Sequence, residues 1–556
     1  MVNRNLFSNQ AVVARTVPAA TTMNDGGGVA YEADPRYALA LYGCTGTFHQ
    51  TFYATDKQHL DRVQALLAQI DDPMFIAKVA VYGHKKAFMK DVPAYLLAHL
   101  TAKSNPRTNP RGDEYAAAFQ KALPLVLDNG KMLSTYSQML FSRATGRRSG
   151  GTRVQRALRK WFDDRTDEQL FHSSIGIADP SLEDVIRMVR PKAKTPSREA
   201  LYKYFLGNTS EEKGYRAGDL PELVKQVEAF KKDPEHAPIP DVSYQLLSSF
   251  TMGKKQWTEI ALNAPWQTLR MNLNTFGRHG VFEDKEVVVR LANKLQDEMA
   301  VGRSKVFPYQ ILVAYLNTRG GLPPVLSHAL HNAMEIATRN VPVFEGRLVI
   351  CPDVSISMSD PITGTQKIEK KGRVTEIQSK VRCIDVAALM TACILRKNPE
   401  ARVIPFCQVA VDLKRLGVHL EPQDTVMTNA QKLSGLLGGG TNCAAPLELL
   451  CTEGAQIDGV LFASDYESWK QSDFYVNMRT AATPMALAWA ILKSRNPNAK
   501  IVCNDLTPKT NLQLNLDPSA LMVGGFSDEV FNIASKWIGG KLTANQWLGE
   551  IEAIEL

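Results

Sequence analysis

Residues 344–357 read Phe-Glu-Gly-Arg-Leu-Val-Ile-Cys-Pro-Asp-Val-Ser-Ile-Ser, an apolar strand that runs directly into Asp353-x-Ser355-x-Ser357. This pattern predicts one carboxylate and two hydroxyls at the carboxyl end of a strand. Ligands of open α/β sheets collect at strand ends, and oxygen donors suit hard cations such as Mg²⁺. Taken alone, the motif is weak evidence for a metal site.

Two later segments strengthen the prediction. Residues 436–442 form a Gly-rich loop that carries the hydroxyl of Thr441, and residues 459–465 form a second apolar strand that ends in Asp465. Helix capping is the alternative role for such side chains, but capping does not require all three segments in this order. The order resembles the metal-ion-dependent adhesion site of von Willebrand factor A (vWA) domains. The resemblance implies that Mg²⁺ is bound through Asp353, Ser355, Ser357, Thr441 and Asp465.

Length and composition bound the class of protein. A chain of 556 residues exceeds one ordinary hydrophobic core, and 44% hydrophobic with 22% charged residues is typical of globular proteins. No apolar run reaches the roughly 18 residues that span a bilayer, and we identify no signal peptide. The eight cysteines are scattered without a Cys-x-x-Cys pair. We therefore expect a cytoplasmic protein without a disulfide framework or membrane association.

The hydrophobic pattern divides the chain into three parts. Residues 1–30 are polar and Gly-rich and are predicted to be a flexible tail. Residues 31–343 are mainly helical, which favours stacked helical repeats of the HEAT kind over an irregular helical domain. In residues 344–556 helices alternate with candidate strands, which predicts a doubly wound α/β domain. The candidate strands cover residues 347–351, 402–406, 459–462 and 500–503.

Charge is spread unevenly over these parts. Residues 1–350 contain 45 Lys and Arg against 35 Asp and Glu, whereas residues 351–556 contain 20 against 22. Residues 143–160 contain seven basic side chains and no acidic one, namely Arg143, Arg147, Arg148, Arg153, Arg156, Arg159 and Lys160. A second cluster contains Arg187, Arg190, Lys192 and Lys194. Arg forks suit phosphates, so these clusters favour nucleic acid over the alternative of an ordinary solvated helix face.

Other constellations are weaker. His328, His331 and Glu335 have helical spacing but lack the His-Glu-x-x-His arrangement of a zinc site. No Ser/His/Asp or Cys/His set indicates a nucleophile. Asp353 and Asp465 could assist metal-dependent hydrolysis, but neither a general base nor a second carboxylate cluster is identifiable.

The order of the segments resembles the Ro autoantigen family, whose helical part is called the TROVE module. The resemblance depends on Gly46-Thr47-Phe48 with the helix that follows, on residues 182–192, 266–276 and 306–312, and on the metal motif after them. It implies a ring of helical repeats that is closed by a vWA domain within a monomer. It also implies binding of small noncoding Y RNA and of single-stranded 3′ ends of misfolded RNA, and cooperation with an exoribonuclease such as polynucleotide phosphorylase.

The function expected from the sequence is therefore RNA binding without catalysis, in RNA quality control and stress survival. One alternative is a metal-dependent protein-adhesion module in which the helices are only a scaffold. A less favoured alternative is a metal-dependent nuclease.

Overall fold

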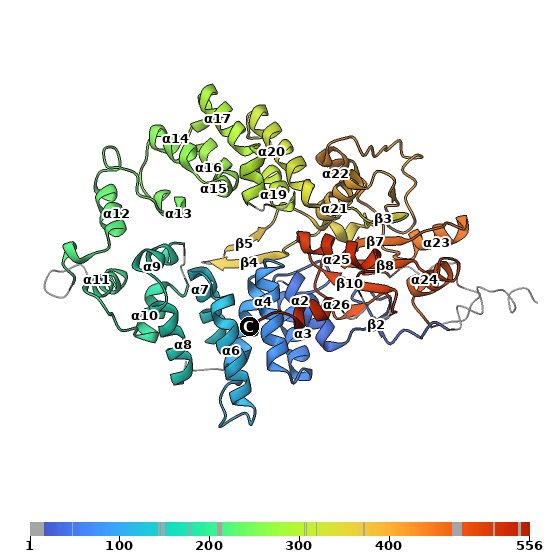
Figure 1. Cartoon of the computed structure of the whole chain (residues 1–556), viewed down its shortest axis with the longest axis horizontal. Helices are drawn as coiled ribbons and strands as arrows, with labels where there is room; N and C mark the ends of the chain where they lie inside the picture. Colours follow the sequence, from blue (N-terminus) through green and yellow to red (C-terminus); the bar gives the residue numbers. More distant parts are fainter. Residues whose placement is uncertain are drawn as a thin grey trace, which may run out of the picture. The chain divides into compact units, whose positions relative to one another are not determined.

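The structure is a computed structural model of the chain (Figure 1), and it describes residues 16–46, 48–142, 145, 151–176, 179–207, 214–304, 306, 308–318, 320–370, 373–469, 481–514, 517–542 and 546–556. The chain divides into two compact units. Unit 1 comprises residues 1–71, 86–89 and 292–553, and unit 2 comprises residues 72–85, 90–291 and 554–556. Each unit is described by itself.

Unit 1 is built on a five-stranded parallel sheet with the strand order β10-β8-β7-β3-β6. Every residue of β3, β7 and β10 is buried, as expected for parallel strands that are covered on both faces. The four candidate strands correspond to β3, β6, β7 and β8, so the predicted α/β fold is confirmed. The strands are β3 (Leu348–Pro352), β6 (Arg402–Val403), β7 (Gly459–Ser464), β8 (Lys500–Asp505) and β10 (Ala520–Gly524).

Helices of unit 1 cover this sheet. Helix α21 packs on β3, and α25 packs on β8 and β10 (Figure 1). Helix α2 also packs on β10, where Leu41 and Thr45 approach Gly524 so closely that a Cβ there would lie 2.9 Å from Leu41. The helices are α2 (Pro35–Thr45), α3 (Asp56–Gln69), α18 (Glu298–Ser304), α19 (Pro308–Thr318), α20 (Pro324–Ala337), α21 (Cys383–Lys397), α22 (Val426–Ser434), α23 (Ala445–Glu453), α24 (Pro484–Arg495), α25 (Asp528–Ile538) and α26 (Gln546–Glu552).

Part of the predicted N-terminal tail is ordered against the rest of unit 1. Strand β1 (Thr22–Met23) pairs with β2 (Val29–Glu32), which pairs with β9 (Asn511–Leu512). The expectation of a flexible tail is thus wrong for these strands, which are too short to give a hydrophobic pattern. An antiparallel hairpin of β4 (Thr365–Lys370) and β5 (Arg373–Gln378) was also not foreseen.

Unit 2 is entirely helical in its described residues, in agreement with the predicted helical region. Successive helices pack on one another, as α4, α5, α6 and α7 do. Its helices are α4 (Pro73–Lys85), α5 (Asp91–Lys103), α6 (Gly112–Val126), α7 (Gly130–Leu140), α8 (Gly151–Asp163), α9 (Asp167–Ser174), α10 (Leu182–Val189), α11 (Pro196–Phe205), α12 (Glu222–Lys232), α13 (Tyr244–Leu247), α14 (Lys254–Asn263), α15 (Trp266–Met271), α16 (Leu273–Arg278) and α17 (Lys285–Leu295), with α17 ending in unit 1.

The compact units do not follow the boundary at residue 343 that the sequence suggested. Helices α2, α3 and α18 to α20 precede that residue but belong to unit 1. Helical periodicity reveals that a segment is a helix, whereas the core against which it packs depends on tertiary contacts. In the part of the chain that the structure describes, none of the helices combines the length and the apolar character needed to traverse a bilayer.

Candidate metal site and nucleic-acid interface

Three loops of unit 1 meet at the carboxyl edge of the sheet. Because β3 and β7 are parallel neighbours, Asp353 after β3 lies beside the end of β7, and its N–H donates to the carbonyl of Ala463 at 3.0 Å. The Gly-rich loop closes on the same place, since Ile356 donates to the carbonyl of Gly439 at 3.0 Å and Gly438 donates to that of Val354 at 2.8 Å. Backbone hydrogen bonds therefore join the loops that the sequence singled out.

All five predicted metal-site residues are buried at this edge, none more than 3% exposed. Asp353 accepts hydrogen bonds from the Ser355 N–H at 2.8 Å and from the Ser464 hydroxyl at 2.5 Å. The Ser355 and Ser357 hydroxyls lie 3.2 Å apart. The remaining members of the set are Thr441 and Asp465. The structure thus brings together two carboxylates and three hydroxyls, and it adds the supporting Ser464, which sequence reasoning had missed.

The electrostatics of the edge fit a bound cation. Burial, and next the charge of Asp465, raise the pKa of Asp353 to about 7, against hydrogen bonds from Ser355 and Ser464 that lower it. Two buried carboxylates at close range repel each other unless a cation or a proton intervenes. An all-oxygen set of this composition suits Mg²⁺. The edge supplies only two of the usual His, Cys, Asp and Glu ligands, and the described residues contain no cluster of three or more of these side chains placed to hold a metal.

Two members of the His328, His331 and Glu335 set are engaged by other groups in the structure. Glu335 accepts a hydrogen bond from the Val426 N–H at 2.6 Å, and it also pairs with Arg396 at 3.4 Å. His331 packs against the ring of Tyr315 with the centroids 4.9 Å apart.

A distant segment reaches the metal-site edge from the N-terminal side. The Tyr53 hydroxyl hydrogen-bonds Ser357, and burial raises the pKa of Tyr53 to about 12, with Asp465 adding to the effect. The neighbouring Phe52 N–H donates to the Asp360 carboxylate at 2.7 Å. Nothing in the local sequence around residues 52–53 indicates this role, because the contact spans some 300 residues of chain.

A buried charge cluster supports the third loop. The Lys509 ammonium lies 3.6 Å from both Glu467 and Asp505, and the three side chains are at most 3% exposed. Burial disfavours the charged lysine, but Asp505 and Glu467 raise its pKa overall. Burial likewise raises the pKa of Asp505 to about 8 and that of Glu467 to about 7, against the effect of Lys509. Lys509 thus acts as an internal counter-ion for Glu467, which lies two residues beyond Asp465.

The turn between β1 and β2 clamps the same loop. Asn24 donates its side-chain amide to the carbonyl of Ser468 at 2.7 Å, and the Gly26 N–H donates to the Glu467 carboxylate at 3.0 Å. Gly28 packs so closely that a Cβ there would lie 1.9 Å from the Ser468 oxygen. We call residues 24–28 the glycine clamp. Gly28, in the Gly-rich run that was expected to belong to a flexible tail, is therefore required for close backbone approach.

Exposed apolar side chains accompany the metal-site loops. Ile356 lies inside the first loop and is 49% exposed, Phe52 beside Tyr53 is 50% exposed, and Trp469 at the third loop is 46% exposed. The Trp469 indole lies over Gly440, next to Thr441. Such side chains together with a recessed polar site are typical of a protein-docking surface.

In unit 2, α8 presents the predicted basic side chains on its surface. Its apolar face is buried through Val154, Leu158, Trp161 and Phe162. Arg153, Arg156 and Lys160 lie exposed at helical spacing. Arg159, in contrast, donates to the Val189 carbonyl at 2.8 Å and so caps the end of α10. Arg143, Arg147 and Arg148 lie outside the described residues.

The basic residues differ in how strongly they are engaged. Arg153 pairs with Asp113 at 2.6 Å, and Lys160 pairs with Asp164 at 2.7 Å, both between exposed side chains. In the second cluster, Arg187 pairs with Glu183 at 2.5 Å and Lys194 pairs with Asp163 at 3.0 Å. Arg190 ends α10 in a left-handed conformation, and its side chain and that of Lys192 are exposed. Exposed pairs of this kind are weak, so these cations are free to exchange partners.

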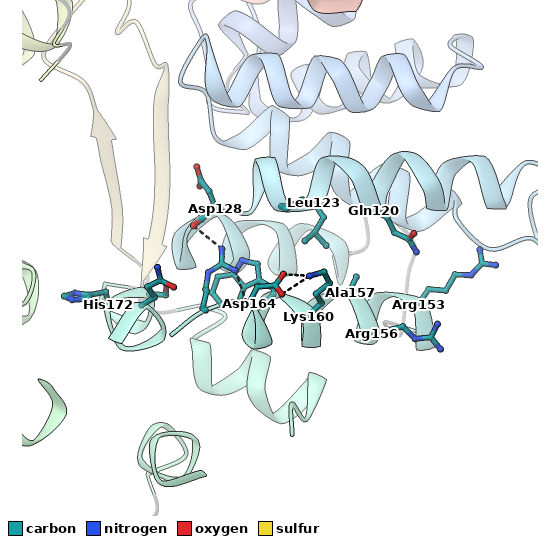
Figure 2. A pocket seen from close by; sticks show the side chains of 14 residues that line it. Gln120, Leu123, Asp128, Arg153, Arg156, Ala157, Lys160, Asp164 and His172 are labelled. Carbon is teal, nitrogen blue, oxygen red and sulfur yellow. Dashed lines mark hydrogen bonds and ion pairs between the residues drawn. The ribbon is translucent and has the colours of Figure 1, made fainter. Parts of the chain in front are cut away.

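A pocket of about 710 Å³ opens between α6, α8 and α9. Figure 2 shows Leu123 and Ala157 on opposite walls, Arg153 and Arg156 at one end, and His172 at the other. A second pocket of about 670 Å³ extends from His172 toward α13, α14 and α15. The first pocket is lined by Gln120, Leu123, Pro124, Asp128, Arg153, Arg156, Ala157, Lys160, Trp161, Asp164, Arg165, Gln169, His172 and Ser173.

The fold and the two candidate sites together define a class of protein. Its members combine a helical region with a vWA domain that has a cluster of oxygen donors at the ends of its strands. Residues 347–538 match the family model described as the Ro60 vWA domain. The RNA-binding protein RO60 of Deinococcus radiodurans is 26% identical over 481 residues, which cover 80% of this chain and 83% of that protein. The crystal structure of the Deinococcus radiodurans Ro (RSR) protein matches 92% of this chain and 100% of that chain, at 21% identity and a TM-score of 0.61.

These matches confirm the resemblance that the sequence suggested. Residues 347–538 are similar to the Ro60 vWA domain, and the chain as a whole is similar to the RNA-binding protein RO60 of Deinococcus radiodurans.

Proposed function

We propose that this chain is a non-catalytic RNA-binding protein of noncoding-RNA quality control and stress survival. The observation that carries the proposal is the exposed cationic face of α8, where Arg153, Arg156 and Lys160 accompany a pocket. The relative from Deinococcus radiodurans is named an RNA-binding protein, which supports the same reading. Small noncoding Y RNA and single-stranded 3′ ends of misfolded RNA are the ligands that we propose.

Binding would depend chiefly on phosphate contacts. Each Lys or Arg that neutralises a phosphate releases a counter-ion, so affinity falls steeply as salt rises. Selection of a single-stranded end requires, in addition, groups that reach unstacked bases. The exposed arginines of α8 supply the first interaction, and the apolar walls beside them are suited to the second.

The proposed role of the metal site is to dock a protein partner. Asp353, Ser355, Ser357, Thr441 and Asp465 would hold Mg²⁺, which would add a positive charge able to bind a carboxylate of the partner. Phe52, Ile356 and Trp469 offer apolar contact beside it. An exoribonuclease such as polynucleotide phosphorylase is the partner that fits RNA decay, and the protein would act as a cytoplasmic monomer.

The test is binding of a structured RNA with and without a single-stranded 3′ tail, across a salt series with Mg²⁺ present. We expect tail-dependent binding with a steep salt slope, and we expect the RNA to stay intact. Equal weak binding of both RNAs would favour the protein-adhesion alternative. Loss of RNA on addition of Mg²⁺, abolished by Asp465→Ala, would instead establish a nuclease.

A further inference from the structure

The α6–α8–α9 pocket combines two kinds of surface. Leu123, Pro124 and Ala157 are apolar residues of its lining. Arg153 and Arg156 provide guanidinium groups at one end (Figure 2). His172 brings a polar side chain to the other end. A volume of about 710 Å³ lies within the range of small-molecule sites, and apolar walls with few polar groups are their usual lining.

The charges around the pocket favour an anionic ligand. Of its two carboxylates, Asp128 pairs with Lys85 at 2.7 Å and also contacts His84 at 3.0 Å, and Asp164 pairs with Lys160. Against the cost of burial, the hydrogen bonds from His84 and Lys85 lower the pKa of Asp128 to about 2. Both acids therefore already have cationic partners.

Arg156 is the available cation of the site. Among the described residues no hydrogen bond or ion pair engages its side chain, which is exposed at the pocket. Arg165, in contrast, is held over the Trp161 ring at 3.6 Å and donates to the Trp161 and Leu127 carbonyls. Arg165 is thus already held in place by the protein. Arg156 and Arg153 remain as the cations that can pair with a negative charge on the ligand.

We propose that this pocket receives one unpaired nucleotide of a bound RNA, with the base against Leu123, Pro124 and Ala157 and the phosphate at Arg156 and Arg153. The inference rests on the proposed RNA-binding function and deepens it, because it assigns the preference for unpaired strand to a specific place. A base that is stacked in a helix cannot enter a pocket, so only an unstacked nucleotide can use these walls. Phosphate contacts alone would need no pocket.

The experiment compares two RNAs by fluorescence anisotropy. Both carry the same hairpin and a 3′ tail of equal length and charge, but one tail is abasic. We expect the abasic tail to bind about tenfold more weakly, since contacts of bases with a protein platform contribute at this level. Excess adenosine monophosphate should compete with the base-bearing tail more effectively than inorganic phosphate does.

Two substitutions localise the effect. Ala157→Phe fills the pocket without changing its charge, so the two tails should bind with equal affinity, whereas Ala117→Phe on the exposed side of α6 should retain the difference. Arg156→Gln should weaken both tails and reduce the salt slope by about 0.7. Lys131→Gln, which removes an exposed cation of α7 outside the pocket, should leave the slope unchanged.

The outcomes separate this inference from the proposed function. Equal binding of both tails to the unmodified protein, or a preserved difference in Ala157→Phe, would overturn the pocket assignment while RNA binding stands. Stronger competition by polyglutamate than by adenosine monophosphate would also overturn it, in favour of an acidic peptide. Failure of every RNA to bind above nonspecific levels would refute the proposed function itself. Circular dichroism of each variant verifies that the helices remain folded.

Discussion

The candidate metal site and the basic face of α8 are built in contrasting ways. The candidate metal site is recessed, consists of two carboxylates and three hydroxyls, and is fixed by backbone hydrogen bonds among three loops that are far apart in the sequence. The basic face consists of exposed side chains on one helix, and its ion pairs are weak. The two sites should therefore respond to different perturbations. Ligand binding at the candidate metal site should depend on the position of single side-chain atoms, whereas binding at the basic face should depend on total charge and on salt concentration.

The largest effect should come from removing one carboxylate of the metal site. Asp353→Asn keeps the shape of the side chain but removes its charge, so we expect Mg²⁺ affinity to fall about 100-fold, at the upper end of what changes around a metal cost. Calorimetric titration with Mg²⁺ measures this, and RNA affinity should change less than twofold. Glu529→Gln, on α25 of the same unit, is the control.

Removing positive charge from α8 should weaken RNA binding and leave Mg²⁺ binding unchanged, the converse of the effect of Asp353→Asn. The triple substitution Arg153→Gln, Arg156→Gln and Lys160→Gln should reduce the salt slope of RNA binding by about 2, because each phosphate contact contributes about 0.7 with single strands. Mg²⁺ affinity should remain at the value of the unmodified protein. A simultaneous loss of both activities would show that the two sites are energetically coupled.

The pH dependence of stability should distinguish the sites in the absence of ligand. Asp353, Glu467 and Asp505 have folded pKa values of about 7, 7 and 8, above the roughly 4 of unfolded chains. These three groups therefore bind more protons in the folded state between about pH 4 and pH 8, and the stability that they contribute falls as pH rises through that window. Melting temperature should be lower at pH 8 than at pH 6, and Mg²⁺ should raise it more at pH 8. Equal stabilisation by Mg²⁺ at both values would contradict this.

A smaller effect is expected at the glycine clamp. Gly28→Ala places a Cβ against the Ser468 carbonyl, so the loop must shift at a cost of about 1–3 kcal/mol. Urea denaturation should report the loss of stability, and Mg²⁺ affinity should fall by a few-fold. Gly218→Ala, where an added Cβ meets open space, should change neither quantity.

The smallest effect is expected for an exposed ion pair of the second basic cluster. Arg187→Gln breaks the pair with Glu183 but leaves the helix intact, so stability should change by less than about 0.5 kcal/mol. The same denaturation measurement applies. A change above 1 kcal/mol would mean that the pair supports more of the structure than its exposure indicates.

The meeting of the candidate metal-site residues at one sheet edge was predictable because its sequence signal is local. A buried strand followed directly by a carboxylate places Asp353 and Asp465 at one edge of any parallel sheet. The supporting groups left no such signal, since Tyr53, Glu467 and Lys509 reach the site only through tertiary contacts. For Glu467, its position two residues after Asp465 was the one available indication.

The sequence predicted where basic residues are dense, but not which of them are exposed and which make structural contacts. Counting charge treated Arg159 as equal to Arg156, although the structure uses Arg159 to cap α10. The Gly-rich segment before residue 30 was misread for a similar reason, because composition cannot distinguish a glycine needed for mobility from one needed for close packing. Strand β10, a short apolar run, was also not predicted.

The glycine clamp also bears on how the chain acquires its structure during synthesis. Asn24 and Ser468, which it joins, are 444 positions apart, so the N-terminal segment emerges from the ribosome long before its partner exists. The helices of unit 2 lie between them in the sequence and can form from local contacts in the meantime. The first strands of unit 1 therefore stay without their pairing partners until the last third of the chain has been translated. Nascent chains stalled before residue 468 should lack protease protection at residues 22–32.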